Sequence, residues 1–127
     1  MKIIELKKLN IIIDKHIINL LYHNNVSVDL DDSRKIYNLV IENINKDKNY
    51  GILTDLRDIK EMSKEARYFF ANIVSDNIKA NAVLIKSKFM SYLVSLYINI
   101  WKPPIKTRYF YTKAEAIAWL TGVLQTA

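Results

Sequence analysis

Hydrophobic and polar residues follow patterns that predict strands and helices in turn along the chain. Short β-branched and aliphatic runs at residues 10–14 and 16–22 predict a hairpin. From Asp29 onward the apolar residues recur at helical spacing, with three aspartates in the first turn, where the helix dipole favours negative charge. We therefore expect a first helix over about residues 30–45.

The middle of the chain shows the order strand, then helix, twice. Residues 50–57 are predicted to form a mostly buried strand, and the apolar run at residues 80–85 has strand length and predicts a central strand covered on both faces. Ser63 and Ser87 are placed to cap the helices that follow them. The first of these helices is expected to end near residue 76.

The last part of the chain contains both prolines. Pro103-Pro104 should end the third helix, because a proline disfavours helical geometry in the residue before it. Residues 105–111 then alternate as a strand. Thr112 and Glu115 fit a capping box in which Thr112 accepts from the Glu115 amide and Glu115 reaches back to Thr112. The side chains expected to point from this fourth helix toward the sheet are Ala116, Trp119, Leu120 and Val123.

The predicted order is β-β-α-β-α-β-α-β-α. It indicates an α/β fold with a mixed, mostly parallel sheet of about five strands and four helices. A chain of 127 residues with 50% hydrophobic and 25% charged residues fits one globular domain over residues 1–127. The sequence contains no cysteine, no transmembrane run and no secretory leader pattern, so we expect a cytoplasmic protein.

Positive charge is concentrated in one part of the chain. The net charge is +6, and from Asn77 to Lys113 there are seven basic residues and no acidic one. Such a distribution suits an anionic partner, but lysines at solvated positions are the commoner explanation. The two interpretations remain open from the sequence.

Several short motifs, in their order and spacing, resemble small bacterial proteins related to the sulfate-transporter and anti-sigma-factor antagonist (STAS) domain. The resemblance covers about residues 10–121. The motifs are Asp55-Leu56-Arg57, Ser63 with Glu65-Ala66-Arg67, Ala80-Asn81-Ala82, Ser87, Pro103-Pro104 through Phe110, Glu115-Ala116 and Trp119-Leu120. The resemblance implies a non-enzymatic, STAS-like fold used for protein recognition and, in distant lipid-transfer relatives, for holding an apolar ligand.

Ser63 is the position that corresponds to a phosphoacceptor in anti-sigma-factor antagonists. Those proteins carry an Asp-Ser-Ser/Thr-Gly type of motif, whereas this chain reads Glu61-Met62-Ser63-Lys64. Because the acidic neighbour and the glycine are missing, we interpret Ser63 as a helix N-cap, with phosphorylation or a partner contact as the alternatives.

The sequence carries few tools for catalysis or for binding cofactors. With only Gly51 and Gly122, it has neither of the glycine-rich nucleotide-binding loops, and we predict no cofactor. His16 and His23 are spaced to point to opposite faces of a strand, which makes them poor metal ligands. Asp55 and Asp58 could form an acid/base pair or bind a metal, but an ionic partner such as Arg57 or Arg67 is the commoner role. We therefore predict no catalytic residues and no metal site.

The third helix carries more apolar surface than a sheet-covering helix needs. Its serines and lysines occupy about a third of the circumference, and the rest is apolar. If Phe89, Leu93, Leu96 and Ile100 face the sheet, a second apolar side is left over. The residues of that side are Met90, Val94, Tyr97, Ile98 and Trp101. Other helices of this chain, a second copy, or a lipid-like ligand or membrane surface could cover it.

A second candidate site lies where the parallel strands end. There the loops and helix starts would gather cations and hydroxyls that suit an anion or an acidic partner. The residues of this rim are Arg57, Ser63, Lys64, Ser87 and Lys88.

Together these patterns predict a non-catalytic STAS-like domain that recognises a protein partner as a homodimer. The alternative is a small carrier for an apolar or amphipathic anionic ligand. Nucleic acid is a poorer fit, because no motif that reads bases is present.

Overall fold

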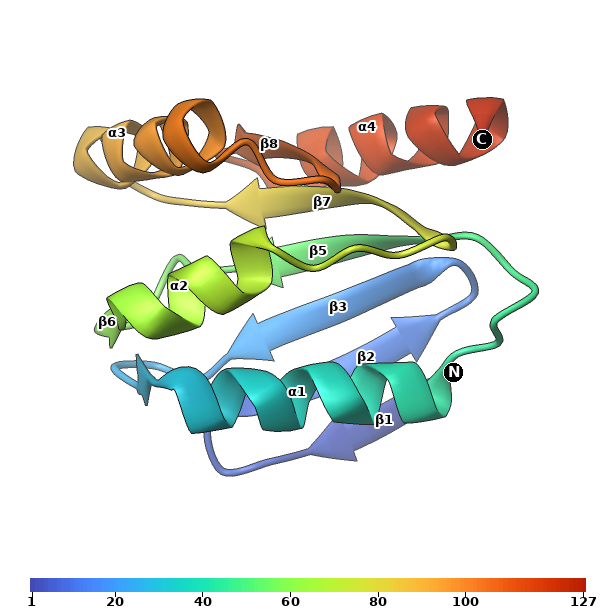
Figure 1. Ribbon diagram of the computed structural model, residues 1–127, viewed down its shortest axis with the longest axis horizontal. Helices are drawn as coiled ribbons and strands as arrows, with labels where there is room; N and C mark the ends of the chain where they lie inside the picture. The colour runs from blue at the N-terminus through green and yellow to red at the C-terminus, as the bar shows by residue number, and fades with distance from the viewer.

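The computed structural model describes residues 1–127 and consists of a six-stranded mixed sheet, a separate two-stranded pair and four α-helices. The six strands of the main sheet are β1 (Lys2–Glu5), β2 (Leu9–Asp14), β3 (Ile17–Tyr22), β5 (Tyr50–Asp55), β7 (Ile78–Leu84) and β8 (Lys106–Phe110). They lie in the order β1-β2-β3-β5-β7-β8, with β1, β2 and β3 antiparallel and the remaining pairs parallel. The mixed, mostly parallel sheet predicted from the sequence is confirmed (Figure 1).

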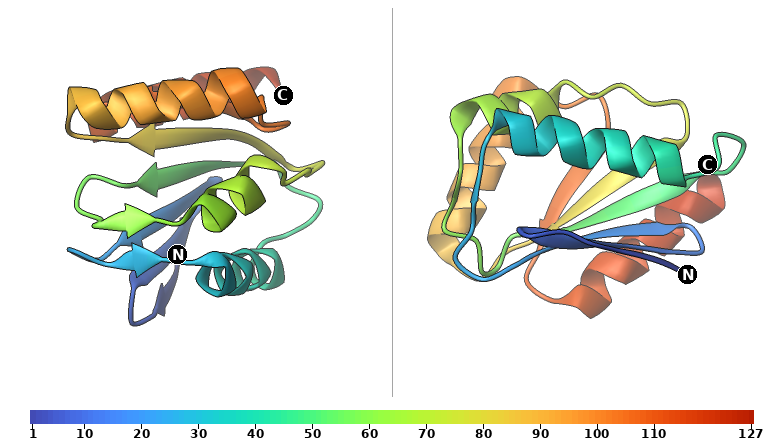
Figure 2. Two further views of the ribbon diagram at one scale, coloured as in Figure 1. Left: turned by 60° about the vertical axis from the view of Figure 1, so that its left-hand side comes forward. Right: turned by 90° about the horizontal axis from the view of Figure 1, so that it is seen from below.

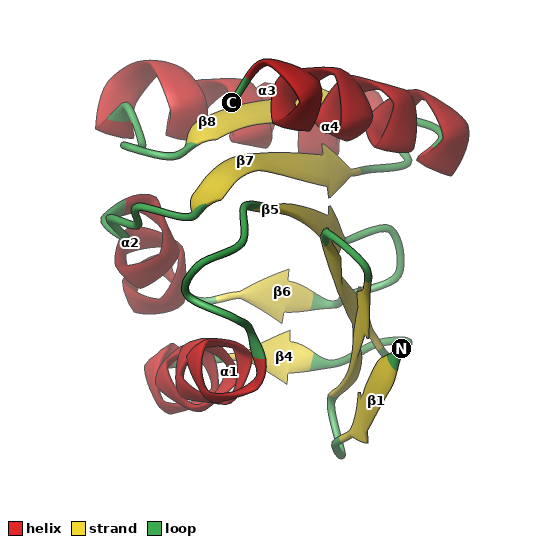
Figure 3. Ribbon diagram, turned by 90° about the vertical axis from the view of Figure 1, so that its right-hand side faces the viewer, coloured by secondary structure: helices red, strands yellow, loops and turns green.

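The helices occupy both faces of the sheet. They are α1 (Leu30–Asn43), α2 (Lys64–Ala71), α3 (Lys88–Leu96), which continues into the π-helical turn η1 (Tyr97–Trp101), and α4 (Lys113–Thr126). A cluster containing Ile18, Ile36, Val40 and Ala66 joins α1 and α2 to one face, and a cluster around Leu53, Leu84 and Leu120 joins α4 to the other. Figure 3 shows α1 and α2 together on one side of the curved sheet.

Local signals decide where the helices begin. Asp29 caps α1 by accepting from the Asp32 amide at 2.8 Å, and the Asp32 carboxylate accepts from the Asp29 amide at 2.9 Å. Ser63 and Ser87 cap α2 and α3 as predicted, each accepting at 3.1 Å from the amide three residues on. Thr112 caps α4, but the Glu115 carboxylate accepts from the Thr112 hydroxyl instead of from its amide. The predicted capping box is therefore only half formed.

Two parts of the architecture were not predicted. β1 is a short antiparallel edge strand beside β2, and the parallel pair β4 (Ser27–Val28) and β6 (Glu61–Met62) lies apart from the main sheet. The strands β1, β4 and β6 are only two to four residues long, so they are too short for a strand periodicity to be recognised. Figures 2 and 3 show the small pair near the starts of α1 and α2.

Helix α2 is shorter than predicted and ends at Ala71 instead of near residue 76. The side chain of Asn72 donates to the carbonyl of Tyr68 at 2.8 Å, and its amide bonds to Phe69. Such a local side-chain bond competes with continued helix. Val74, which the apolar pattern placed on the helix, lies instead in the following loop and is exposed.

Candidate functional site

Helix α3 begins and ends at well-defined residues. Ser87 caps it, and the last turn widens into the π-helical residues of η1. Lys102 follows with φ 45°, a left-handed conformation that is unusual for a lysine, and its amide bonds to the carbonyl of Ile98 at 3.1 Å. Pro103 comes next, so the helix ends where the prolines predicted.

None of the residues of α3 and η1 is buried. The most exposed apolar side chains form a stripe at spacings of three, four, seven and eleven residues from the first, which places them on one side of the helix. We call this stripe the contact face, and it consists of Phe89, Tyr92, Leu93, Leu96 and Ile100. Phe89 is 70% exposed and Ile100 is 66% exposed, so the chain itself leaves this face largely uncovered.

The predicted assignment of the two sides of α3 was wrong, although the predicted excess of apolar surface is present. The residues expected to remain uncovered are half-buried instead, namely Met90, Val94, Tyr97, Ile98 and Trp101. Phe89, Leu93, Leu96 and Ile100, expected to face the sheet, are exposed. The reason is the position of the helix: α4 packs directly on β5, β7 and β8, whereas α3 makes its main contacts with η1, and η1 in turn contacts α2.

A small pocket lies between α2 and the contact face. Its volume is about 120 Å³, and we call it the Arg67 pocket, lined by Arg67, Leu93, Leu96, Tyr97, Ile100 and Trp101. Burial raises the pKa of the Tyr97 hydroxyl to about 12. The Trp101 ring meets Tyr68 of α2 edge-on at 5.9 Å between ring centroids. The pocket therefore joins the contact face to the exposed aromatic surface of α2.

Arg67 has no ionic partner in this pocket. Its Nε atom is buried and makes no hydrogen bond, and no carboxylate lies within ion-pair distance of its guanidinium group. A buried donor without an acceptor costs free energy, about 1–3 kcal/mol for a neutral group and more for a charged one. Asp55 and Asp58, which the sequence offered as partners of Arg67, form ion pairs elsewhere.

Asp55 pairs with Arg57 and Asp58 with Lys86. Arg57 donates to both carboxylate oxygens of Asp55, at 3.0 and 2.8 Å. Partial burial by itself raises the pKa of Asp55, but the hydrogen bonds and charge of Arg57 outweigh it and hold that pKa below its usual value. The Asp58–Lys86 pair is 3.4 Å long and exposed. Both aspartates therefore have ordinary ionic partners, and no third acidic or histidine side chain joins them.

The two histidines also have local partners. A ring nitrogen of His16 lies 2.8 Å from the Asn49 carbonyl oxygen. His23 contacts the Lys7 carbonyl oxygen at 2.9 Å and the Asn10 side chain at 3.2 Å. Neither histidine belongs to a group of metal-ligating side chains.

The predicted rim lies where expected in the fold, but most of its groups are already engaged. Figure 1 shows the starts of α2 and α3 on the side toward which β5 and β7 point. The hydroxyls of Ser63 and Ser87 accept from backbone amides, and Arg57 is held by Asp55. Lys64 and Lys88 are exposed and form no ion pair. Two cations thus remain available at this rim.

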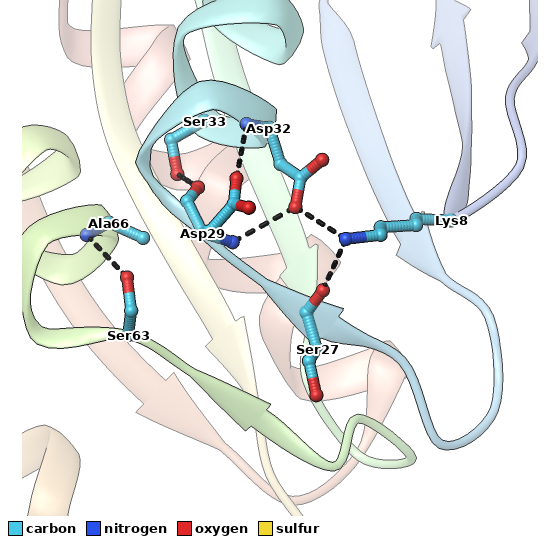
Figure 4. Close-up of polar contacts among 7 residues, drawn as sticks. All are labelled: Lys8, Ser27, Asp29, Asp32, Ser33, Ser63 and Ala66. Carbon is cyan, nitrogen blue, oxygen red and sulfur yellow. Dashed lines mark hydrogen bonds and ion pairs between the residues drawn. The ribbon is translucent and has the colours of Figure 1, made fainter.

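A polar cluster that the sequence did not single out holds the start of α1 (Figure 4). The Lys8 amine donates to the Ser27 carbonyl and to the Asp32 carboxylate, both at 2.7 Å. Partial burial by itself raises the pKa of Asp32, but hydrogen bonds from Lys8 and from the Asp29 amide outweigh it and lower that pKa. Because the polar groups of Lys8, Asp29 and Asp32 form hydrogen bonds with one another and with nearby backbone, we assign the cluster a structural role. A lysine in a turn, distant in sequence from its carboxylate, gives no recognisable sequence signal.

A wider groove separates α1 from α2. Its volume is about 690 Å³, and it is open to solvent. Arg34 and Tyr37 line it from α1, and Lys64, Glu65 and Phe69 line it from α2. The sequence did not predict this groove, because it depends on the separation of two helices.

Comparison with known proteins places the chain in a family. Residues 11–124 match the family described as Domain of unknown function (DUF7793). The chain belongs to this family. No curated protein matches it.

A solved structure has a similar fold. It is the crystal structure of an uncharacterised protein of the DUF3478 family, with a SpoIIAA-like fold, from Shewanella loihica PV-4. The similarity has a TM-score of 0.58 at 13% identity and covers 88% of this chain and 91% of that one. For the DUF7793 chain this supports the STAS-like fold expected from the sequence. No helix in the structure has the length and apolar character needed to cross a membrane.

Proposed function

We propose that this DUF7793 protein is a non-catalytic, STAS-like interaction domain that recognises a protein partner through the contact face of α3. One observation carries the proposal: five large apolar side chains lie on one side of α3 and remain exposed, from 37% at Leu96 to 70% at Phe89. A contiguous exposed apolar patch on a folded protein usually marks an interaction site. We also propose that residues 1–127 form one domain and that the protein acts in the cytoplasm.

The chemistry elsewhere in the chain is consistent with a role in binding. Asp55 and Asp58 form ion pairs with neighbouring cations, and both histidines contact nearby backbone carbonyls. Ser63 caps α2, a structural role for which phosphorylation is not required. The unengaged cations Lys64 and Lys88 lie at the starts of α2 and α3, where they suit the acidic side chains of a partner.

A direct test compares the wild-type protein with Leu93→Asp. Leu93 is 38% exposed, so the charge is placed at the surface and the free energy of unfolding should change little. The matched control is Ile41→Asp, an exposed aliphatic residue of α1 outside the contact face. Proteins cross-linked to the wild type in cells should not be captured by Leu93→Asp and should still be captured by Ile41→Asp. The purified partner should likewise bind the wild type and Ile41→Asp but not Leu93→Asp. Equal binding by the two variants would contradict the proposal.

A second copy of the chain is one candidate for the partner, as the predicted homodimer requires. Size-exclusion chromatography with light scattering measures this directly. If the contact face forms the homodimer, Leu93→Asp should convert a dimer to a monomer and Ile41→Asp should not. A wild-type monomer at all concentrations would remove self-association and leave recognition of another chain.

The groove between α1 and α2 favours a second candidate function, a carrier for an apolar or amphipathic anionic ligand. Its volume of about 690 Å³ suits a small molecule, and it combines aromatic side chains with Arg34 and Lys64. Native mass spectrometry of protein purified under mild conditions should then show a bound species that is lost in Phe69→Asp. A mass equal to that of the bare chain would contradict the carrier role.

A further inference from the structure

We propose that the partner of the contact face is an amphipathic helix of a different protein, with acidic side chains flanking its apolar seam, one of which pairs with Arg67. This inference rests on the proposed function, since it names the chemistry of the partner that the contact face would bind. It follows from the spacing of the stripe, the unpaired guanidinium group and the distribution of charge.

The spacing of the stripe fits a helical partner. Phe89, Tyr92, Leu93, Leu96 and Ile100 repeat nearly as in the apolar seam of two packed helices. A helix laid along α3 buries such a stripe continuously, with its own residues at the same spacing between those of α3. The stripe also adjoins Trp101 and Tyr68, so the partner helix would rest in the angle between α3 and α2.

Arg67 supplies the specific polar contact. Arg67 lines the same pocket as Leu93, Leu96 and Ile100, and its buried Nε donor has no acceptor. A charged group in apolar surroundings is normally paired, and a guanidinium binds a carboxylate through two parallel hydrogen bonds. A glutamate or aspartate beside the partner's apolar seam would pair with the outer nitrogens of this guanidinium group, which form no ion pair, while its neighbours cover the leucines.

The charges at the ends of the contact face favour the same partner. Lys88 and Lys102 are exposed at the two ends, and no acidic residue occurs between Asp76 and Glu115. Lys88 also lies in the first turn of α3, where the helix dipole disfavours a cation. An acidic residue opposite Lys88 relieves this repulsion, and one opposite Lys102 gains an ionic partner.

The same charges argue against a symmetric pair of contact faces. In an antiparallel pair Lys88 would face Lys102 of the second copy, and in a parallel pair each lysine would face its equivalent. The α3 and η1 segments of a second copy would offer Arg67 no carboxylate in either arrangement, because residues 88–101 include no acidic residue. Like charges placed opposite each other weaken an interface and suppress that pairing.

A displayed library of helical peptides tests the inference with the full chain as bait. Leucines are fixed at the seam positions, and Glu, Lys, Gln and Ser are encoded with equal frequency at the flanking positions. We expect selection to enrich glutamate. The affinity of a selected peptide should fall about tenfold or more in Arg67→Gln, the usual effect of losing a charge-assisted hydrogen bond. Lys48→Gln, which removes an exposed cation in the loop before β5, is the matched control and should not change the affinity.

A spectroscopic measurement separates a direct contact from a general effect on folding. The Nε–H resonance of Arg67 in nitrogen–proton correlation spectra should shift when the selected peptide is added, together with the amides of residues 88–101. Thermal unfolding of Arg67→Gln shows whether the variant is folded. A selected peptide that leaves the Arg67 resonance unchanged overturns the assigned pairing.

The remaining outcomes distinguish failure of this inference from failure of the proposed function. The selected peptides could require Leu93 for binding and yet be enriched in lysine, or in no charged residue. That result overturns the acidic partner and leaves the contact face as a recognition surface. Two other results also overturn the acidic partner. One is a dimer that Leu93→Asp dissociates, and the other is binding to phosphatidylglycerol vesicles that requires Leu93, without enrichment of acidic peptides. A selection that yields no peptide able to distinguish the wild type from Leu93→Asp overturns both.

Discussion

Gly51 and Leu120 lie close together where helix α4 packs on the sheet, and they should be energetically coupled. Gly51 lies in β5, and Leu120 is completely buried. A Cβ atom added at Gly51 would lie 2.9 Å from Cδ2 of Leu120, closer than real Cβ contacts, but 3.5 Å from its Cβ, an ordinary separation. The conflict therefore involves only the end of the leucine side chain.

The expected free energies of unfolding follow from this geometry. Gly51→Ala should destabilise the wild type by about 1–3 kcal/mol, since a well-packed core resists an added methyl group. Leu120→Ala should cost about 2–5 kcal/mol for lost burial and for the cavity that remains. In the Leu120→Ala background the new methyl group meets only the alanine Cβ. Gly51→Ala should then stabilise by about 0.4–1 kcal/mol, because alanine has less conformational freedom than glycine in the unfolded chain.

Urea unfolding of the wild type, both single variants and the double variant measures this coupling. The sign of the Gly51→Ala effect should reverse between the two backgrounds, giving an interaction free energy of about 1.4–4 kcal/mol. If Gly51→Ala has the same effect in both backgrounds within about 0.5 kcal/mol, the described packing of α4 on β5 is wrong.

Three further predictions concern the polar groups. Lys8→Met should lower the free energy of unfolding by about 1 kcal/mol at neutral pH. The pKa of Asp32 is lowered in the folded protein, so the stabilisation it provides is present above its unfolded pKa near 4 and is lost as pH falls through its folded pKa. The difference in free energy of unfolding between wild type and Lys8→Met should therefore shrink at acidic pH. A difference that stays constant with pH would contradict the pairing. Arg57→Gln should raise the pKa of Asp55 toward its usual range in a carboxyl-carbon NMR titration, and an unchanged titration would mean that Arg57 does not hold it. Tyr22→Phe should leave the free energy of unfolding unchanged or raise it by up to about 1 kcal/mol, because the Tyr22 hydroxyl is buried without a partner, whereas a clear loss would reveal a hydrogen bond.

The elements that could be predicted are those whose signals are local. The Ser63 and Ser87 caps, the end of α3 before Pro103 and the burial of Ala116 and Leu120 follow from spacing along a few residues, and the structure confirms each. Strand β1 and the pair β4–β6 were missed because these strands are only two to four residues long, too short to show a hydrophobic period.

The candidate site shows the same division. The sequence showed that α3 has more apolar surface than one sheet contact can cover. It could not show which side is turned outward, and the prediction placed Met90 and Val94 on the wrong side. That choice depends on how α3 and η1 pack beside α2, which is a long-range contact.

The sequence alone therefore determined the order of the longer strands and the four helices, the caps of α2 and α3, the end of α3 and the amount of apolar surface on α3. Hydrophobic period, capping residues and prolines act within a few residues of the chain. The tertiary structure decided which face of α3 is exposed, and it left Arg67 in an apolar pocket without a carboxylate. It also joined Lys8 to the start of α1. These arrangements bring together residues from different elements, so their energies depend on distances that no local pattern encodes.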